Sequence, residues 1–123
     1  MNLNTARVFV RDIAQAKRFY AETLGLTPVA ANLEHGYCVF NTGGIQLVVE
    51  SVSNDAPQED QALVGRFTGL SFTVADIQQT YRSLAAAGVE FTGSPEKQFW
   101  GGILATLKDP AGNELQVVQL AAA

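Results

Sequence analysis

Apolar and polar residues alternate along two segments of the chain, residues 5–10 and 69–74. Since successive side chains of a strand point to opposite faces, each segment is predicted to be a strand with one apolar and one mixed face. The apolar face would pack against a helix, and the mixed face would point elsewhere. The apolar sets are Ala6, Val8 and Val10 in the first segment, and Leu70, Phe72 and Val74 in the second.

The same Asp-Ile-x-Gln sequence follows both predicted strands, beginning at Asp12 and at Asp76. An aspartate there can cap a helix, because its carboxylate accepts a backbone N–H of the first turn, and the following glutamine can complete a capping box. Apolar residues then recur at helical spacing until Gly25 in the first copy and Gly88 in the second. The pattern predicts two helices with the same cap and the same glycine stop.

Short strand candidates follow each helix. They are TPVAA, GYCVF and IQLVVE in the first half, and VEFTG, GILATL and LQVVQL in the second. The last two candidates of each half are joined by a turn sequence, NTGG in the first half and DPAGN in the second. Each half therefore has the order β-α-β-β-β, which is typical of an α+β fold.

The first hairpin has a predicted register. A turn over residues 41–44 pairs Val39 with Gln46 and Tyr37 with Val48. Tyr37 and Val39 then lie on the mixed face, because side chains of a strand alternate between faces. Cys38, between them, is predicted to be buried towards the helix, where a thiol behaves as a small hydrophobe.

The repeat also predicts the domain organisation. Module 1 covers residues 1 to about 52, module 2 covers about 67–120, and a polar, acidic linker covers about 53–66, all within a single domain of residues 1–123. A half of about 50 residues buries too little surface to be stable alone. We expect the modules to share one curved mixed sheet, an open cup with the helices outside.

Composition narrows the choice of partner and compartment. A net charge of −4, with no run of Lys and Arg, argues against nucleic acids and anionic membranes. No apolar run approaches the ~20 residues needed to span a bilayer, and the first residues lack the pattern of a signal peptide. A single cysteine excludes an internal disulfide. We therefore expect a cytoplasmic protein.

Motifs over essentially the whole chain resemble those of vicinal oxygen chelate proteins. This superfamily includes glyoxalase I, extradiol dioxygenases, and fosfomycin- and bleomycin-resistance proteins. The motifs are VRDIAQAKRFYAETLGL, VADIQQTYRSLAAAGVEF and WGGILATLKDPAGNELQVV, in that order. Their order is specific for the fold and poorly specific for the activity.

The resemblance also implies where a metal would bind. Metal-using members of the superfamily place His, Gln or Glu ligands at positions that correspond here to Thr5, Gln46, Gly69 and Gln116. These four residues contain no imidazole and no carboxylate, which a catalytic dication prefers. The single histidine, His35, lies elsewhere. We expect no bound metal, and this favours the metal-free bleomycin-resistance-like branch.

The mixed faces of the predicted strands provide a lining for the cup. Most of its side chains are apolar or form hydrogen bonds, as in pockets for small molecules. Arg7 either meets a polar group of a ligand or only pairs with Glu50. Trp100, beside Phe99 in a loop, either stacks on a flat ligand or belongs to the core. The candidate ligand-binding residues are Arg7, Phe9, Tyr37, Val39, Gln46, Val48, Glu50, Ser71, Trp100 and Gln116, with Thr5, Thr73 and Val118 on the same faces.

Different classes of function fit this lining. The first is a binding protein that sequesters an aromatic or amphipathic compound, as in antibiotic resistance, without converting it. The second is an enzyme, either a metal-free lyase or isomerase or a divergent metalloenzyme of the glyoxalase or dioxygenase type. A domain with a filled cup that binds only partner proteins is a third. The weak metal ligands favour the first class, and no catalytic residue is identified.

The resemblance further predicts a homodimer, because family members of this size commonly pair and often complete the cup across the interface. Sedimentation at micromolar concentration should therefore show a species of about twice the 13.1 kDa mass of the chain. A sample that contains only the monomer would contradict this prediction.

Overall fold

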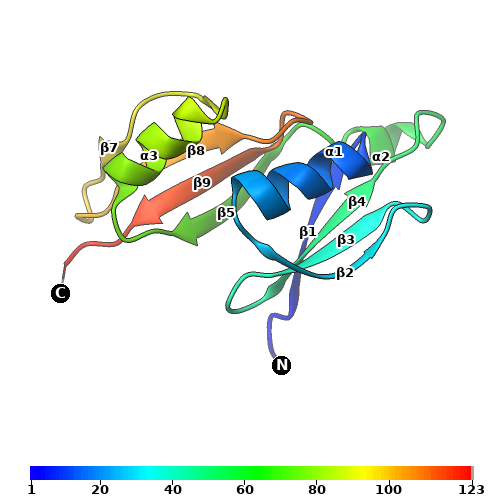
Figure 1. Cartoon of the computed structure of the whole chain (residues 1–123), viewed down its shortest axis with the longest axis horizontal. Helices are drawn as coiled ribbons and strands as arrows, with labels where there is room; N and C mark the ends of the chain where they lie inside the picture. The colour runs from blue at the N-terminus through cyan, green and yellow to red at the C-terminus, as the bar shows by residue number, and fades with distance from the viewer. Residues whose placement is uncertain (123) are drawn as a thin grey trace. The chain divides into compact units, whose positions relative to one another are not determined.

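The computed structural model describes residues 1–122 and divides the chain into two compact units (Figure 1). Unit 1 comprises Met1–Arg66 and Pro110–Asn113, and unit 2 comprises Phe67–Asp109 and the segment that begins at Glu114. Each unit follows the order β-α-β-β-β, with the second strand of unit 2 split in two, so the predicted α+β fold class is confirmed. Among the described residues the strands form two hydrogen-bonded sheets, one in each unit.

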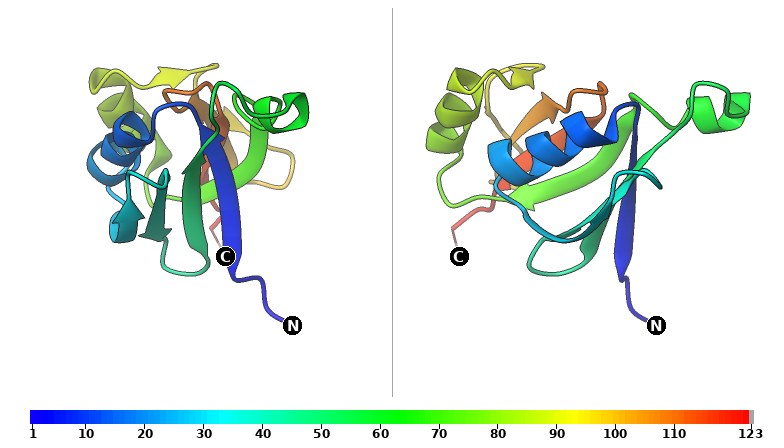
Figure 2. Two further views of the ribbon diagram at one scale, coloured as in Figure 1. Left: turned by 90° about the vertical axis from the view of Figure 1, so that its right-hand side faces the viewer. Right: turned by 45° about the vertical axis from the view of Figure 1, so that its right-hand side comes forward.

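Unit 1 is a four-stranded sheet with a helix on one face. Its strand order is β1-β4-β3-β2, in which β1 and β4 are parallel and the other neighbours are antiparallel. Figure 2 shows α2 in a loop that projects beyond the end of β4. The elements are β1 (Thr5–Val10), α1 (Ile13–Arg18), the π-helical segment η1 (Phe19–Thr23), β2 (Thr27–Asn32), β3 (Tyr37–Asn41), β4 (Gln46–Ser51) and α2 (Gln58–Gln61).

Unit 2 repeats this plan with a five-stranded sheet. The strand order is β5-β9-β8-β6, with β7 also paired to β8, and β5 and β9 are parallel. The predicted strand VEFTG is shorter than expected, because only two of its residues form β6. The elements are β5 (Phe67–Thr73), α3 (Ile77–Ala86), β6 (Glu90–Phe91), β7 (Glu96–Lys97), β8 (Ile103–Lys108) and β9 (Glu114–Gln119).

The predicted aspartates cap both helices. Asp12 accepts the backbone N–H of Gln15 at 3.0 Å at the start of α1, and Asp76 accepts that of Gln79 at 3.1 Å at the start of α3. The two caps share the same extended backbone conformation. The repeat seen in the sequence is therefore a repeat of local structure.

The two helices end differently although glycine follows both. α1 changes into the π-helical segment η1 before Gly25, whereas α3 remains α-helical until shortly before Gly88. Both glycines have positive φ angles, 75° and 93°, which favour glycine because it has no Cβ. None of the helices within residues 1–122 is long and apolar enough to cross a membrane.

The core of unit 1 lies between the sheet and the first helix. Val8 and Val10 of β1 are buried, as the alternation predicts, and so are Cys38 and Phe40 of β3. Tyr20 is fully buried against Phe40, with ring centroids 5.9 Å apart. The first helix therefore covers one face of the unit 1 sheet and leaves the other face open.

The predicted register of the first hairpin is wrong by two residues. Tyr37 pairs with Glu50 and Val39 with Val48, because β3 continues to Asn41 and the loop occupies residues 42–45. The side chains of that loop explain the difference. Asn41 accepts the backbone N–H of Gly43, and Thr42 donates to the carbonyl of Ile45, so the loop closes one residue later than expected. A shift of two residues keeps every side chain on its predicted face.

Asn113 is buried and joins separate segments of unit 1. Its side-chain oxygen accepts the backbone N–H groups of Gly65 at 2.8 Å and Arg66 at 3.3 Å. Its side-chain nitrogen donates to the carbonyl of Phe9 at 2.7 Å. The segment Pro110–Asn113 thus belongs to unit 1, although the strands before and after it belong to unit 2.

Replacing Asn113 by alanine should destabilise the protein by about 2 kcal/mol or more, since a buried backbone group left without a partner costs about 1–3 kcal/mol. Urea unfolding would measure the change. Asn54→Ala, in an exposed loop, is the matched control and should change stability by less than about 0.5 kcal/mol. Equal stability of the two variants would show that the side-chain bonds of Asn113 contribute nothing.

Candidate functional site

The open face of the unit 1 sheet carries most of the predicted site residues. Residues paired across neighbouring strands share a face, so the register arranges this face in cross-strand rows. The rows run from β1 through β4 and β3 to β2. They are Phe9, Glu50, Tyr37 and Asn32; Arg7, Val48, Val39 and Ala30; and Thr5, Gln46, Asn41 and Thr27.

Arg7 is held in place by two neighbours on this face. Its Nε lies 2.8 Å from Glu50 Oε1 and its Nη2 lies 2.8 Å from Glu50 Oε2, a two-pronged ion pair. Its guanidinium carbon lies 5.2 Å from the centre of the Phe9 ring. The hydrogen bonds and charge of Glu50 raise the pKa of Arg7 above its usual value. The predicted pairing of Arg7 with Glu50 is therefore present.

The ion pair leaves donors of Arg7 available. A guanidinium carries five N–H groups, and the contact with Glu50 uses one on Nε and one on Nη2. The remaining N–H groups lie on the two terminal nitrogens, which form a fork suited to carboxylate, sulfonate or carbonyl oxygens. The Arg7 side chain is 56% exposed, so this fork is accessible.

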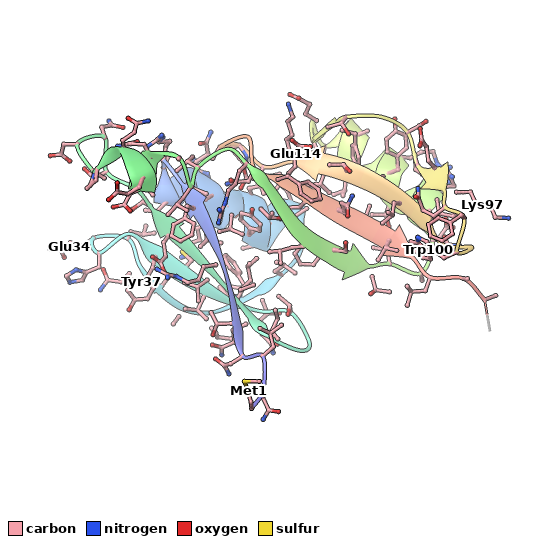
Figure 3. The ribbon with its side chains drawn as sticks, turned by 180° about the vertical axis from the view of Figure 1, so that it is seen from behind. Met1, Glu34, Tyr37, Lys97, Trp100 and Glu114 are labelled. Carbon is pink, nitrogen blue, oxygen red and sulfur yellow. The ribbon has the colours of Figure 1, made fainter. Side chains whose placement is uncertain are left out.

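Apolar side chains flank this cation. Val48 and Val39 lie in the same row as Arg7 and are half-buried. Tyr37 stands in the next row and is 37% exposed; Figure 3 labels it on β3. The open face of unit 1 thus combines one fixed cation with a partly apolar surface.

The positions at which the resemblance implies metal ligands differ between the units. Thr5 and Gln46 are direct partners on β1 and β4. In unit 2 the partner of Gln116 is Ser71, whereas Gly69 lies in a bulge of β5 with a φ angle of 75°. Within residues 1–122 no three His, Cys, Asp or Glu side chains gather as a metal cluster. The expected lack of a metal stays a prediction.

The reactive side chains considered from the sequence lie outside the open faces. His35 is exposed in the turn between β2 and β3, and its backbone N–H is bound by the side chain of Asn32. Cys38 is fully buried, and burial raises the pKa of its thiol. A buried thiol with a raised pKa is a poor nucleophile.

The open face of unit 2 carries a chain of neutral hydrogen bonds. Ser71 Oγ donates to Gln116 Oε1 at 3.2 Å, and Gln116 Nε2 donates to Thr106 Oγ1 at 3.3 Å. The three residues are direct partners on β5, β9 and β8. Thr106 is absent from the predicted site. Counting back from the DPAGN turn would have found it, because hairpin pairing sets it opposite Gln116.

Trp100 lies at one end of the unit 2 sheet, opposite the end that carries Glu114 (Figure 3). It is 43% exposed, so it is not a core residue, while the neighbouring Phe99 is fully exposed. The indole packs over Gly102, where a Cβ would lie only 1.8 Å from the ring carbon Cζ3. The missing side chain of Gly102 therefore makes room for the ring.

The Glyoxalase/Bleomycin resistance protein/Dioxygenase superfamily matches residues 2–117, and the chain belongs to it. The uncharacterized protein YurT of Bacillus subtilis (strain 168) is 31% identical, covering 97% of this chain and 99% of its own. YraH of the same strain is 26% identical over 98% of this chain and 99% of its own. A crystal structure of a superfamily member from Sphaerobacter thermophilus DSM 20745 is 28% identical, with a TM-score of 0.80 and 98% of each chain covered.

Gly102→Ala should displace the indole of Trp100, because the new methyl group would overlap the ring. Trp100 is the single tryptophan, so its fluorescence reports this change alone, and its emission should shift to longer wavelength as exposure to water increases. Gly93→Ala, where nothing lies within 4 Å of the new Cβ, is the control. Identical emission spectra for the two variants would contradict the packing of Trp100 on Gly102.

Proposed function

We propose that this protein binds a small aromatic or amphipathic molecule on its open sheet faces, without a metal and without converting it, as sequestering resistance proteins do. The observation that carries the proposal is Arg7, which Glu50 and Phe9 hold so that its terminal nitrogens remain available. A fixed cation beside half-buried apolar side chains is suited to a ligand with a flat apolar body and one polar end. Predominantly apolar surface with a few placed polar groups is the usual composition of such sites.

Ligand chemistry supports binding without a metal. Thr5 and Gln46 offer only neutral oxygens, and Thr5 already donates its hydroxyl hydrogen to Asn4 at 2.7 Å. The amide oxygen of Gln116 accepts from Ser71. Imidazole and carboxylate groups, which retain a transition metal through dialysis, are missing from these positions.

The purified, dialysed protein should therefore contain no stoichiometric transition metal. Elemental analysis would measure this, together with a turnover screen on glyoxalase, dioxygenase, lyase and isomerase substrates with added Mn, Ni, Zn and Fe. One equivalent of tightly bound metal per chain, or turnover that depends on such a metal, would replace the binding function with an enzymatic one.

Binding itself can be measured with 8-anilinonaphthalene-1-sulfonate, an aromatic probe with one sulfonate. Arg7→Met should weaken its binding about tenfold, because one charge-assisted hydrogen bond contributes about 1.5–3 kcal/mol and tenfold in affinity is 1.4 kcal/mol. Fluorescence titration gives the dissociation constants.

Arg18→Met is the matched control, since Arg18 is exposed on the helix α1. It should bind the probe as the unchanged protein does. If Arg7→Met lowers the melting temperature but leaves probe affinity unchanged, Arg7 is only a structural ion-pair partner.

Native mass spectrometry of the protein as purified would also detect a ligand that copurifies.

A further inference from the structure

Gln116 has an unusually constrained position on the open face of unit 2. It stands on β9 between Ser71 on β5 and Thr106 on β8, and both neighbours hydrogen-bond its amide. One neighbour binds the oxygen and the other binds the nitrogen, so tilting the amide away from the two flanking strands would break both bonds. Its buried neighbours along the strand, Leu115 and Val117, fix the side on which its side chain lies.

The remaining valences of this amide point in one direction. A primary amide has two N–H groups and an oxygen with two lone pairs. Ser71 and Thr106 stand on the flanking strands, so they use the lone pair and the N–H that point sideways. In a primary amide the other lone pair and the other N–H lie side by side on one edge, and with both flanking strands occupied we expect this edge to face away from the sheet. Within the described chain Gln116 makes no other side-chain hydrogen bond.

This free edge consists of one acceptor next to one donor. The description does not depend on which atom of the amide is assigned as oxygen, because exchanging the two gives the mirror-image edge with the same groups. An ionised carboxylate offers only acceptors, and an ammonium group offers only donors. A carboxylate would bind the free N–H but place its other oxygen against the lone pair. An ammonium group would bind the lone pair but place another N–H against the free N–H.

We propose that Gln116 recognises a neutral cis-amide edge of a flat ligand, such as a ring lactam or imide, through a pair of hydrogen bonds. The inference rests on the proposed function and specifies the ligand class for this face. Ser71 and Thr106 act as positioning residues, which hold the amide before the ligand arrives and so reduce the ordering cost of binding. The next row pairs Leu104 with Val118, and of these the half-buried Leu104 offers apolar surface for the ring, whereas Val118 is buried.

Two probes that differ in one hydrogen-bond donor test the proposal. The first is 2-quinolinone, a flat lactam, and the second is its N-methyl derivative, which lacks the N–H. The unchanged protein should bind the lactam up to about tenfold more tightly, because one net hydrogen bond contributes about 0.5–1.5 kcal/mol and tenfold in affinity is 1.4 kcal/mol. Calorimetry or fluorescence titration gives both dissociation constants, and their ratio cancels the contribution of the aromatic ring.

Variants assign the preference to the amide. Gln116→Met should reduce the ratio of dissociation constants to about one, and Ser71→Ala combined with Thr106→Val should lower it in part. Gln78→Met, on the exposed surface of α3, should keep the full ratio. Thermal melts show whether each variant is folded. Because the ratio compares two ligands on the same folded protein, a change in stability alone does not alter it.

The outcomes separate this inference from the proposed function. Equal affinity of the two probes for the unchanged protein, or a preference that survives in Gln116→Met, overturns the role of Gln116. In that case binding of 8-anilinonaphthalene-1-sulfonate still supports the proposed function. If neither the quinolinones nor that probe bind, the proposed function and the inference fail together.

Discussion

Burial of one face of each sheet beneath a helix is the constraint on which the rest of this structure depends. A strand sends alternate side chains to opposite faces, so the choice of buried residues also determines the open ones. In unit 1 the burial of Val8 and Val10 leaves Arg7 and Phe9 on the other face. In unit 2 the burial of Leu115 and Val117 leaves Gln116, which stands between them, on the open face. The candidate site is therefore a consequence of the core.

The polar side chains on the open faces are fixed by their neighbours rather than by burial. Glu50 orients Arg7 with two hydrogen bonds, and Ser71 and Thr106 orient Gln116 with one each. In both cases the internal contacts use part of the hydrogen-bonding capacity and leave the rest accessible. Such side chains lose less conformational freedom when a ligand binds, because much of it is already lost in the free protein.

Local patterns in the sequence predicted what depends on local structure. The caps at Asp12 and Asp76 follow from residues close together, and the faces of the strands follow from the period of two along a strand. The pairing of Arg7 with Glu50 joins residues 43 positions apart, and the sequence left it as one of two alternatives. The hairpin register and the bulge at Gly69 did not follow, because they depend on how a particular loop or strand closes its own hydrogen bonds. The sequence also gave no indication of the contacts of Asn113, which join residues far apart in the chain.

The position of Asn113 has a consequence for the order of events during synthesis. Unit 1 includes Met1–Arg66 but also Pro110–Asn113, and the strand β8 is translated between them. A nascent chain that ends at Arg66 already contains every strand of the unit 1 sheet. It still lacks Asn113, whose side-chain oxygen accepts the backbone N–H groups of Gly65 and Arg66. Unit 1 can be completed only after most of unit 2 has left the ribosome. The first repeat in the sequence thus depends for its completion on a segment that is translated after most of the second repeat.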